Sequence, residues 1–258
     1  MNFFLLCMFM AVARGSAAGD GSRSSITFSL VAGENFISIP VRPDRDALAD
    51  VFPSGSLPAG QADADSTIIF TYGGATDARP QAVYYRLSED GHWMYSTGGI
   101  ADAATLPIGE GFNIRLPAGA AAQKLVVTGR VPSGPVAREL AGVAGATNYH
   151  VVGWPYPCPV RVRDLGLIEA GFEGGINVAR SDEIRILNNA NGQGSVQAPK
   201  ARIWLNAKTS RCEFTVPRSG PAEDYVIEPG EAIIVVRKRA PALLWTMTSP
   251  CPPSPDAQ

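Results

Sequence analysis

The sequence has little histidine and little cysteine, and these two scarcities exclude several kinds of active site. Among 258 residues there are two histidines, His92 and His150, and four cysteines. The cysteines lie dozens of residues apart, which is not the spacing of a zinc site. The chain also has no Gly-x-Ser-x-Gly stretch, the turn that presents the nucleophile of an α/β-hydrolase. The sequence therefore shows no constellation of catalytic residues.

Charge of one sign is scarce as well. Charged residues make up 18% of the chain and the formal net charge is −2, with acids and bases mixed along the sequence. A nucleic-acid-binding surface needs clustered Lys and Arg, so we expect no nucleic-acid partner. The apolar fraction of 45% is enough for a hydrophobic core, which excludes disorder over most of the length.

Apolar runs of membrane-spanning length are missing. The apolar run at residues 3–12 is ten residues long, whereas a helical span needs about 20. Ser16, Ala17 and Ala18 follow it in the small-x-small pattern that a signal peptidase cleaves after. We therefore predict a signal peptide at residues 1–18, a secreted or periplasmic protein, and no membrane span in the mature form. We predict that residues 251–258 form a polar tail.

Removal of the signal peptide leaves three cysteines, all in the second half: Cys158, Cys212 and Cys251. An oxidising compartment favours one disulfide and leaves one thiol. Cys212 alternates with Phe214 and Val216 as on the buried face of a strand, so we predict a buried thiol there. Cys158 and Cys251 each follow a terminal strand of their part of the chain. This favours a Cys158–Cys251 disulfide, although the spacing does not exclude the other pairings.

Glycine and proline, by contrast, are abundant, with 27 and 21 copies. They separate short stretches in which apolar and polar residues alternate, a pattern typical of many short strands joined by tight turns. At residues 106–115 a Pro-Gly turn leads into a buried strand, and residues 227–237 repeat this unit.

Other segments repeat in the same order. Residues 37–40 correspond to 152–155 at an offset of 115, and Gly109-Glu110 correspond to Gly230-Glu231 at an offset of 121. Loop insertions account for the difference between these two offsets, because loops tolerate insertions at little cost. We therefore predict an all-β fold of two tandem small β-barrel or sandwich modules related by internal duplication. The predicted modules cover 25–132 and 144–250, with a linker at 133–143 and one short helix in each module, at 45–52 and 162–168.

The order of these motifs resembles that of an uncharacterised family of exported bacterial proteins with tandem β modules. An Asn-x-Ile/Val-Ser/Gly-x-Pro strand opens the module (residues 35–40), Pro-x-Gly-Glu-Gly-Phe lies near its end (107–112), and Leu-x-x-Thr-Gly closes it (125–129). The resemblance spans roughly residues 25–250 and implies export and a tandem β architecture. The family has no assigned catalytic residues, so no activity is implied. The second module departs from the pattern at His150 and Ala232, where Asn and Gly are expected.

Aromatic and amide side chains are the first candidates for ligand binding. Exposed Tyr and Trp rings on a flat sheet can stack on sugars, and amides can hydrogen-bond them. The candidate ligand-binding residues are Tyr72, Tyr85 and Trp93 in the first module, and Asn188 and Asn189 in a polar loop of the second. The alternative is that the rings belong to the core and that the asparagines merely form a long hairpin connection.

Paired carboxylates are the second group of candidates. Asp63 with Asp65, and Asp182 with Glu183, precede apolar strands at places that the repeat pattern makes equivalent. Such pairs can bind calcium or act as acid and base on a polysaccharide. They can equally end strand pairing and keep loops soluble. The glutamate in each copy of the repeated turn predicts a structural role, because duplicated positions usually record the fold.

These observations favour an exported, non-catalytic protein that binds or assembles at the cell surface or in the periplasm. A glycan or a surface protein is the expected partner, and we expect no cofactor and no metal. Two close modules would allow avidity for a repeating ligand. A secreted polysaccharide hydrolase with the paired acids at the module interface is the alternative from the enzyme class. A structural matrix component without a discrete ligand is the third hypothesis.

Overall fold

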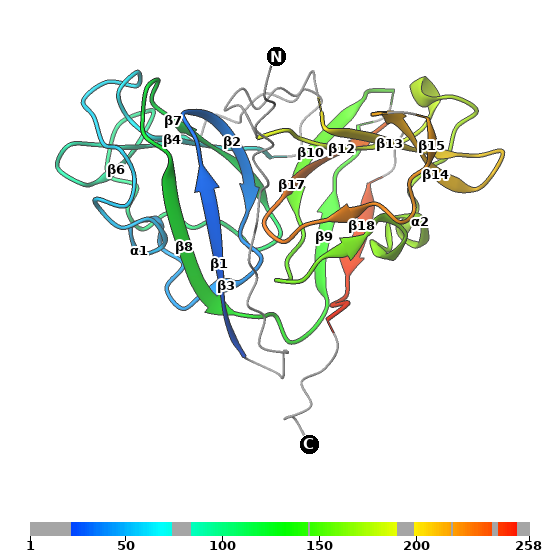
Figure 1. Cartoon of the computed structure of the whole chain (residues 1–258), viewed down its shortest axis with the longest axis horizontal. Coiled ribbons are helices and arrows are strands. Elements are labelled where there is room, and N and C mark those ends of the chain that lie inside the picture. The colour runs from blue at the N-terminus through cyan, green and yellow to red at the C-terminus, as the bar shows by residue number, and fades with distance from the viewer. Residues whose placement is uncertain are drawn as a thin grey trace, which may run out of the picture.

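The computed structural model describes residues 22–73, 84–143, 145–189, 199–217, 219–238 and 242–251. The predicted signal peptide lies outside these residues, and so does the predicted polar tail apart from Cys251. Within them the chain consists mainly of short strands arranged as two lobes side by side (Figure 1). The predicted all-β class is confirmed.

The first half of the chain forms two antiparallel sheets. A three-stranded sheet has the order β1-β8-β3, and a five-stranded sheet has the order β2-β7-β4-β5-β6. The elements are β1 (Arg23–Leu30), β2 (Gly33–Ser38), β3 (Arg42–Pro43), α1 (Leu48–Val51), β4 (Ile68–Thr71), β5 (Tyr84–Leu87), β6 (Trp93–Tyr95), β7 (Gly111–Leu116) and β8 (Gln123–Arg130).

The second half forms one large sheet and two strand pairs. The large sheet has the order β10-β17-β12-β13-β14-β15, and the pairs are β18-β9 and β11-β16. The elements are β9 (Val136–Leu140), β10 (Asn148–Gly153), β11 (Val160–Arg161), η1 (Val162–Asp164), α2 (Leu167–Ala170), η2 (Val178–Arg180), β12 (Glu183–Ile186), β13 (Ala201–Asn206), β14 (Arg211–Val216), β15 (Gly220–Pro221), β16 (Val226–Ile227), β17 (Ala232–Arg237) and β18 (Leu243–Met247).

The large sheets of the two halves share their strand order. Strands β2, β7, β4, β5 and β6 correspond in position to β10, β17, β12, β13 and β14, and β15 is an addition at the edge. The repeated sequence segments fall on these corresponding strands. This shared order is the one that a duplicated module requires, while descent of both halves from one ancestral module stays a prediction.

Each half encloses its own core between its sheets. In the first, alternate residues of β1 and β8, such as Ile26, Phe28 and Leu125, share a core with Ile69 and Phe112 of the five-stranded sheet. All five are at most 6% exposed. Alternate residues of a strand point to opposite faces, so the other face of each large sheet is left for other contacts. The arrangement is a sandwich in both halves.

The second core contains the predicted thiol and is closed by the predicted disulfide. Trp154 and Trp245 lie in this core with ring centroids 6.5 Å apart, and Cys212 is 3% exposed among them. Cys212 is a free, buried cysteine, which confirms the predicted buried thiol, and burial raises the pKa of this thiol to about 11. Cys158 and Cys251 form a disulfide across 93 residues of sequence, with their Cα atoms 6.1 Å apart. This pairing is confirmed.

The connection between the modules is shorter than the predicted linker at 133–143. Strand β8 ends at Arg130 and β9 begins at Val136. Strand β9 pairs with β18 from Val136↔Met247 to Leu140↔Leu243, so it belongs to the second sandwich. The sequence conceals this strand because Arg138 interrupts the apolar alternation between Val136 and Leu140.

The helices are also shorter than predicted. Helix α1 is a single turn of four residues within the predicted 45–52. In the second half the predicted 162–168 divides into η1 and α2, because Gly166 between them adopts a left-handed φ of 70°. Among the described residues no helix is both long enough and apolar enough to cross a bilayer.

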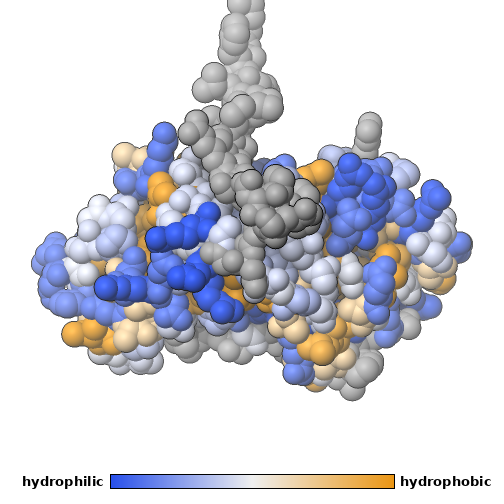
Figure 2. Space-filling model, turned by 90° about the horizontal axis from the view of Figure 1, so that it is seen from below, coloured by the Kyte–Doolittle hydropathy of each residue, from blue (hydrophilic) through white to orange (hydrophobic). Residues whose placement is uncertain are grey.

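Among the described residues, the large exposed apolar side chains come from both modules. They are Ile100, Val126, Val143, Ile168, Ile176, Val226 and Leu244. The face shown in Figure 2 is polar over most of both lobes, with small, separate apolar areas. Isolated apolar residues of this kind are normal on a protein surface.

Candidate functional site

The repeated Pro-Gly-Glu turns form the joint between the modules. Gly109 of the first turn accepts a hydrogen bond from the Gly153 amide at 3.0 Å, and Gly230 of the second accepts one from the Ser38 amide at 2.9 Å. Isolated bridges connect Glu110 with Val152 and Ile37 with Glu231 in the same reciprocal way. Each turn therefore covers the edge strand of the other module, β2 or β10, which would otherwise expose unpaired backbone groups.

Close backbone approach at this joint explains one of the glycines. A Cβ atom on Gly153 would lie 1.9 Å from the Cβ of Ser38, its counterpart in the first module. No side chain larger than hydrogen fits at position 153 while Ser38 stays in place. The Ser38 side chain thus occupies the space that a side chain at position 153 would need.

Apolar side chains from the outer faces of both large sheets complete the joint. Phe36 and Tyr72 of the first module form one buried cluster with Val151, Leu187 and Ile234 of the second. This third core is separate from the two sandwich cores. Its burial ties the modules together through the hydrophobic effect, so they form one body rather than two swinging domains.

An ion pair adds to the joint on one side only. Arg138 of β9 donates to the Gly109 carbonyl at 3.0 Å and lies 3.3 Å from the Glu110 carboxylate. Burial raises the pKa of Glu110 and lowers the pKa of Arg138, and their mutual attraction opposes both shifts. Glu231 instead caps its own turn by accepting from the Glu228 amide at 3.0 Å and pairs with Lys200.

The aromatic residues predicted to bind ligand are core residues. Tyr85 is 6% exposed and Trp93 is fully buried in the first core, where the Trp93 indole donates to the Phe52 carbonyl at 3.0 Å. Tyr72 is 8% exposed in the joint. A buried ring has no free face for a sugar, so we assign these three residues to packing. Strand alternation alone does not say which face a second sheet covers.

The two predicted amides have different places. Asn189 bridges the modules, because its side chain accepts from the Phe36 amide at 2.9 Å and donates to the Phe36 carbonyl at 2.7 Å. It therefore belongs to the joint. Asn188 is exposed at the end of the segment that follows β12. The rest of their predicted loop, residues 190–198, lies outside the described residues.

The two acid pairs are not structural equivalents. Strand register places Thr67 and Ile68 at the positions of Asp182 and Glu183, since Ile68 pairs with Arg115 as Glu183 pairs with Val236. Asp63 and Asp65 lie in the preceding loop, exposed to solvent. Asp63 is 3.3 Å from Arg86, and Asp65 accepts from the Ala62 amide at 2.8 Å. These contacts order the loop.

Asp182 is fully buried and ties three segments together. One carboxylate oxygen accepts from the Glu173 amide and from Nε of Arg237, both at 2.9 Å, and the other accepts from the Lys238 amide at 2.7 Å. Such a carboxylate is satisfied by its own fold. We therefore assign Asp182 a structural role.

Glu183 is also fully buried, beneath a set of cations. Its Oε2 accepts from Nε of Arg202 at 2.6 Å and from Arg185 at 3.3 Å, and Nζ of Lys238 lies 3.0 Å from its Oε1. Burial acts to raise the pKa of Glu183, but the bonds from Arg202 and Lys238 and the nearby charges outweigh it and lower the pKa. Glu183 is thus ionised at neutral pH and unsuited to the general-acid role that a hydrolase needs.

These contacts leave an excess of positive charge. The two carboxylates meet four cations, Arg185, Arg202, Arg237 and Lys238. The side chains of Arg202, Arg185 and Lys238 are 35%, 16% and 17% exposed, whereas Glu183 is not exposed at all. The cluster therefore presents cations to solvent and hides its anions.

Trp204 adjoins this cluster on the same face of the sheet. It lies opposite Glu183 of β12 on one side and opposite Glu213 of β14 on the other. The flanking residues of β13 on this face are Arg202 and Asn206, and Asn206 donates to Glu213 at 2.9 Å. Trp204 is only partly buried. These residues lie beyond the part of the outer face that the joint covers. From here on, the outer face of the second sheet means Arg185, Arg202, Trp204, Asn206 and Glu213.

Sequence reasoning misses this face as a site. Trp204 is visible in the sequence as an aromatic residue among alternating polar ones, which is the one signal available. The cations around Glu183 come from β12, β13 and the end of β17, and Lys238 is 55 residues away in sequence. Only the strand order brings them together.

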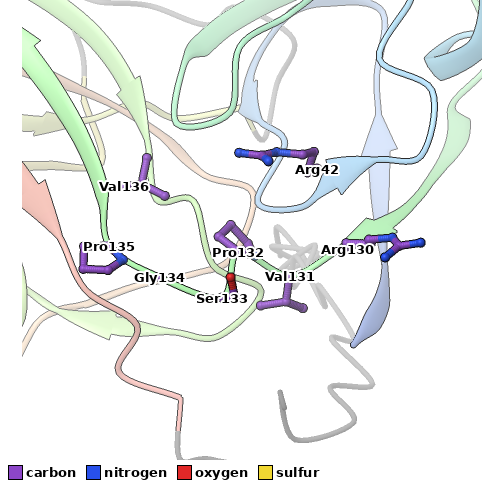
Figure 3. Close-up of a pocket in the computed structure, with 8 residues that line it drawn as sticks. All are labelled: Arg42, Arg130, Val131, Pro132, Ser133, Gly134, Pro135 and Val136. Atoms are coloured by element: carbon purple, nitrogen blue, oxygen red, sulfur yellow. The ribbon is translucent and has the colours of Figure 1, made fainter. Parts of the chain in front are cut away.

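A pocket of about 460 Å³ lies at the connection between the modules (Figure 3). Residues 130–136 line it together with Arg42, and the side chains of Arg42 and Arg130 extend in opposite directions in this view. Arg130 lies 3.6 Å from Asp44. One arginine above an exposed connection is a weaker recognition element than the outer face of the second sheet.

Another titratable pair orders a loop of the first module. Nδ1 of His92 lies 2.7 Å from Asp102, and the same carboxylate accepts from the Trp93 amide at 2.7 Å. The hydrogen bond to Asp102 and its charge raise the pKa of His92. Within the described part of the chain, no group of three or more His, Cys, Asp or Glu residues is arranged to hold a metal ion.

Comparisons with protein-family models, with curated proteins and with solved structures find no match for this chain.

Proposed function

We propose that this protein is an exported, non-catalytic binding protein that holds a glycan on the outer face of its second sheet. The observation that carries the proposal is the partly exposed ring of Trp204, with Arg202 and Asn206 beside it on the same strand. An aromatic face next to hydrogen-bonding side chains is suited to stacking on a sugar ring.

The joint supports this function by making the platform rigid. Binding sites on strands are more precise than sites on loops, and they need a backbone that does not move. The first module covers the edge of the second sheet at β10 through its turn at Gly109. Under the proposed function the first module stabilises the second sheet, and the second module binds the ligand.

Export is supported by two independent features. The apolar run and small residues before position 19 have the pattern of a signal peptide. The disulfide between Cys158 and Cys251 is of the kind that persists in oxidising compartments. The resemblance to exported bacterial proteins with tandem β modules agrees with both.

The test is co-sedimentation of the chain from Gly19 onward with insoluble polysaccharides and peptidoglycan, followed by an assay of released sugar. We expect binding without release. Trp204→Ala should weaken binding about tenfold or more, because truncating a Trp that anchors a binding site commonly costs about 2 kcal/mol or more. Tyr95→Ala, which removes a partly exposed ring of the first module, is the matched control and should bind like the unchanged chain. Released sugar, or equal binding by the Trp204 variant, would contradict the proposal.

A further inference from the structure

The cations beside Trp204 hold hydrogen-bond donors that the fold itself does not use. Arg202 contacts Glu183 through Nε, and within the described residues its two terminal nitrogens have no hydrogen-bond partner, with Tyr149 as a further electrostatic neighbour of the side chain. Arg185 contacts Glu183 through Nε and Nη2, which leaves Nη1. A guanidinium offers five N–H donors in a plane and suits a carboxylate in particular.

Glu183 acts as a buried support that fixes these guanidiniums. Its carboxylate is fully buried, so no ligand reaches it, and its contacts to Arg202 and Arg185 hold both side chains on the sheet. Arg185 is further held over the Tyr149 ring, 5.7 Å from its centroid. Side chains that are already ordered lose less entropy when a ligand binds. The positive excess is therefore preorganised rather than mobile.

The charges on either side of Trp204 are opposite, so a charged ligand stacked on this ring has a preferred orientation. Arg202 precedes Trp204 by two residues on the same face, about 7 Å along the strand. Glu213 lies across from Trp204 on the next strand and accepts hydrogen bonds from Asn206 at 2.9 Å and Thr209 at 3.0 Å. An acidic group on a stacked ligand is attracted towards Arg202 and repelled by Glu213. Neutral hydroxyl groups suit the Asn206 and Glu213 side.

We infer that the ligand is an acidic saccharide, stacked on Trp204 with its carboxylate bound by the terminal nitrogens of Arg202 and by Arg185. This inference rests on the proposed function and names the ligand class of the same face. No covalent step is involved.

The test is a titration of the mature chain with three soluble probes: polygalacturonate, neutral dextran and dextran sulfate. We expect tight binding of polygalacturonate and none of dextran. Arg202→Gln and Trp204→Ala should each weaken the polygalacturonate affinity about tenfold or more. Arg45→Gln, in which an 81% exposed arginine of the first module loses its charge, is the matched control and should change nothing. Circular dichroism and thermal unfolding confirm that each variant is folded.

The outcomes distinguish failure of the acidic ligand from failure of the glycan-binding function. Equal binding of dextran and polygalacturonate, lost in Trp204→Ala but not in Arg202→Gln, would overturn the acidic ligand and leave the glycan-binding function. Binding of dextran sulfate alone, unaffected by Trp204→Ala, would mean general charge attraction and overturn the inference. No binding of any probe or insoluble polysaccharide would overturn both.

Discussion

The two modules share a strand order but differ in what their large sheets carry on the outer face. Strand register places Ile68 and Phe70 of β4 where β12 has Glu183 and Arg185. It likewise places Arg86 of the first module where the second has Trp204. The first module thus has an apolar strand where the second has a buried carboxylate under arginines.

The difference shows which positions the sandwich constrains. Residues on the inner face, such as Ile69 and Ile184, pack into a core in both modules and stay apolar. Residues on the outer face are constrained by whatever covers them. Phe36 and Tyr72 of the first module are covered by the joint. The part of the second sheet beyond the joint is free to carry charge.

The largest effect should come from removing the buried carboxylate. Glu183→Gln leaves the cations around it without their counter-charge, so we expect a loss of about 3–5 kcal/mol in the free energy of unfolding. Chemical denaturation measures this loss. The matched variant replaces Glu183, Arg185 and Arg202 with Ile, Phe and Tyr, the residues of the first module, and should recover most of the stability. A loss below about 1 kcal/mol for Glu183→Gln would mean that the cluster does not depend on this carboxylate.

The next effect, about 3 kcal/mol in the free energy of unfolding, should come from protonation of His150. This residue lies where the first module has Asn35. Burial, opposed by the hydrogen bond to the Ala141 carbonyl and reinforced by Arg138 and Arg237, lowers the pKa of His150 to about 4. The unfolded chain binds the proton below pH 6.5 and the folded chain only below about 4, so stability falls as the pH is lowered between these values.

His150→Asn gives the second module the residue of the first and should remove this component. Urea unfolding of both proteins at pH 7 and pH 4.5 measures it. An equal pH dependence in the two proteins would show that other groups cause the acid loss.

The smallest effect, about 2–3 kcal/mol, should come from overpacking the joint. Gly153→Ala places a Cβ where the Ser38 side chain lies, and misfit of this kind costs stability without touching the ligand face. Ser38→Gly in the same chain makes room and should restore most of the loss. A double-mutant cycle with no coupling between the two positions would contradict the reciprocal joint.

Much of this fold can be predicted from the sequence, because its signals are local. Pro-Gly turns and alternating strands such as residues 26–30 mark the β architecture, and the paired turns mark corresponding places in two sheets of the same strand order. The disulfide is predictable because Cys212 lies on the apolar face of an alternating strand, where a buried thiol is expected. Cys158 and Cys251 are then the two cysteines left to pair. Strand β9 is not, since Arg138 serves the joint and breaks its pattern.

The site is much less predictable than the fold. Trp204 shares its strand face with Arg202 and Asn206, a pattern that favours the outer face of the second sheet. No such pattern says that Trp93 lies inside the first sandwich. Asp182 and Glu183 are visible as a pair, yet their roles depend on Arg202, Arg237 and Lys238 from other strands. Strand pairing over such sequence separations follows from topology and not from local pattern.

The most direct test of the account is to map backbone amide shifts by NMR while polygalacturonate is added to the mature chain. The account predicts saturable shifts that centre on β12, β13 and the end of β17, with β4 and β5 of the first module unchanged. Shifts centred on the first module, or spread evenly over both, would contradict the assignment of ligand binding to the second sheet.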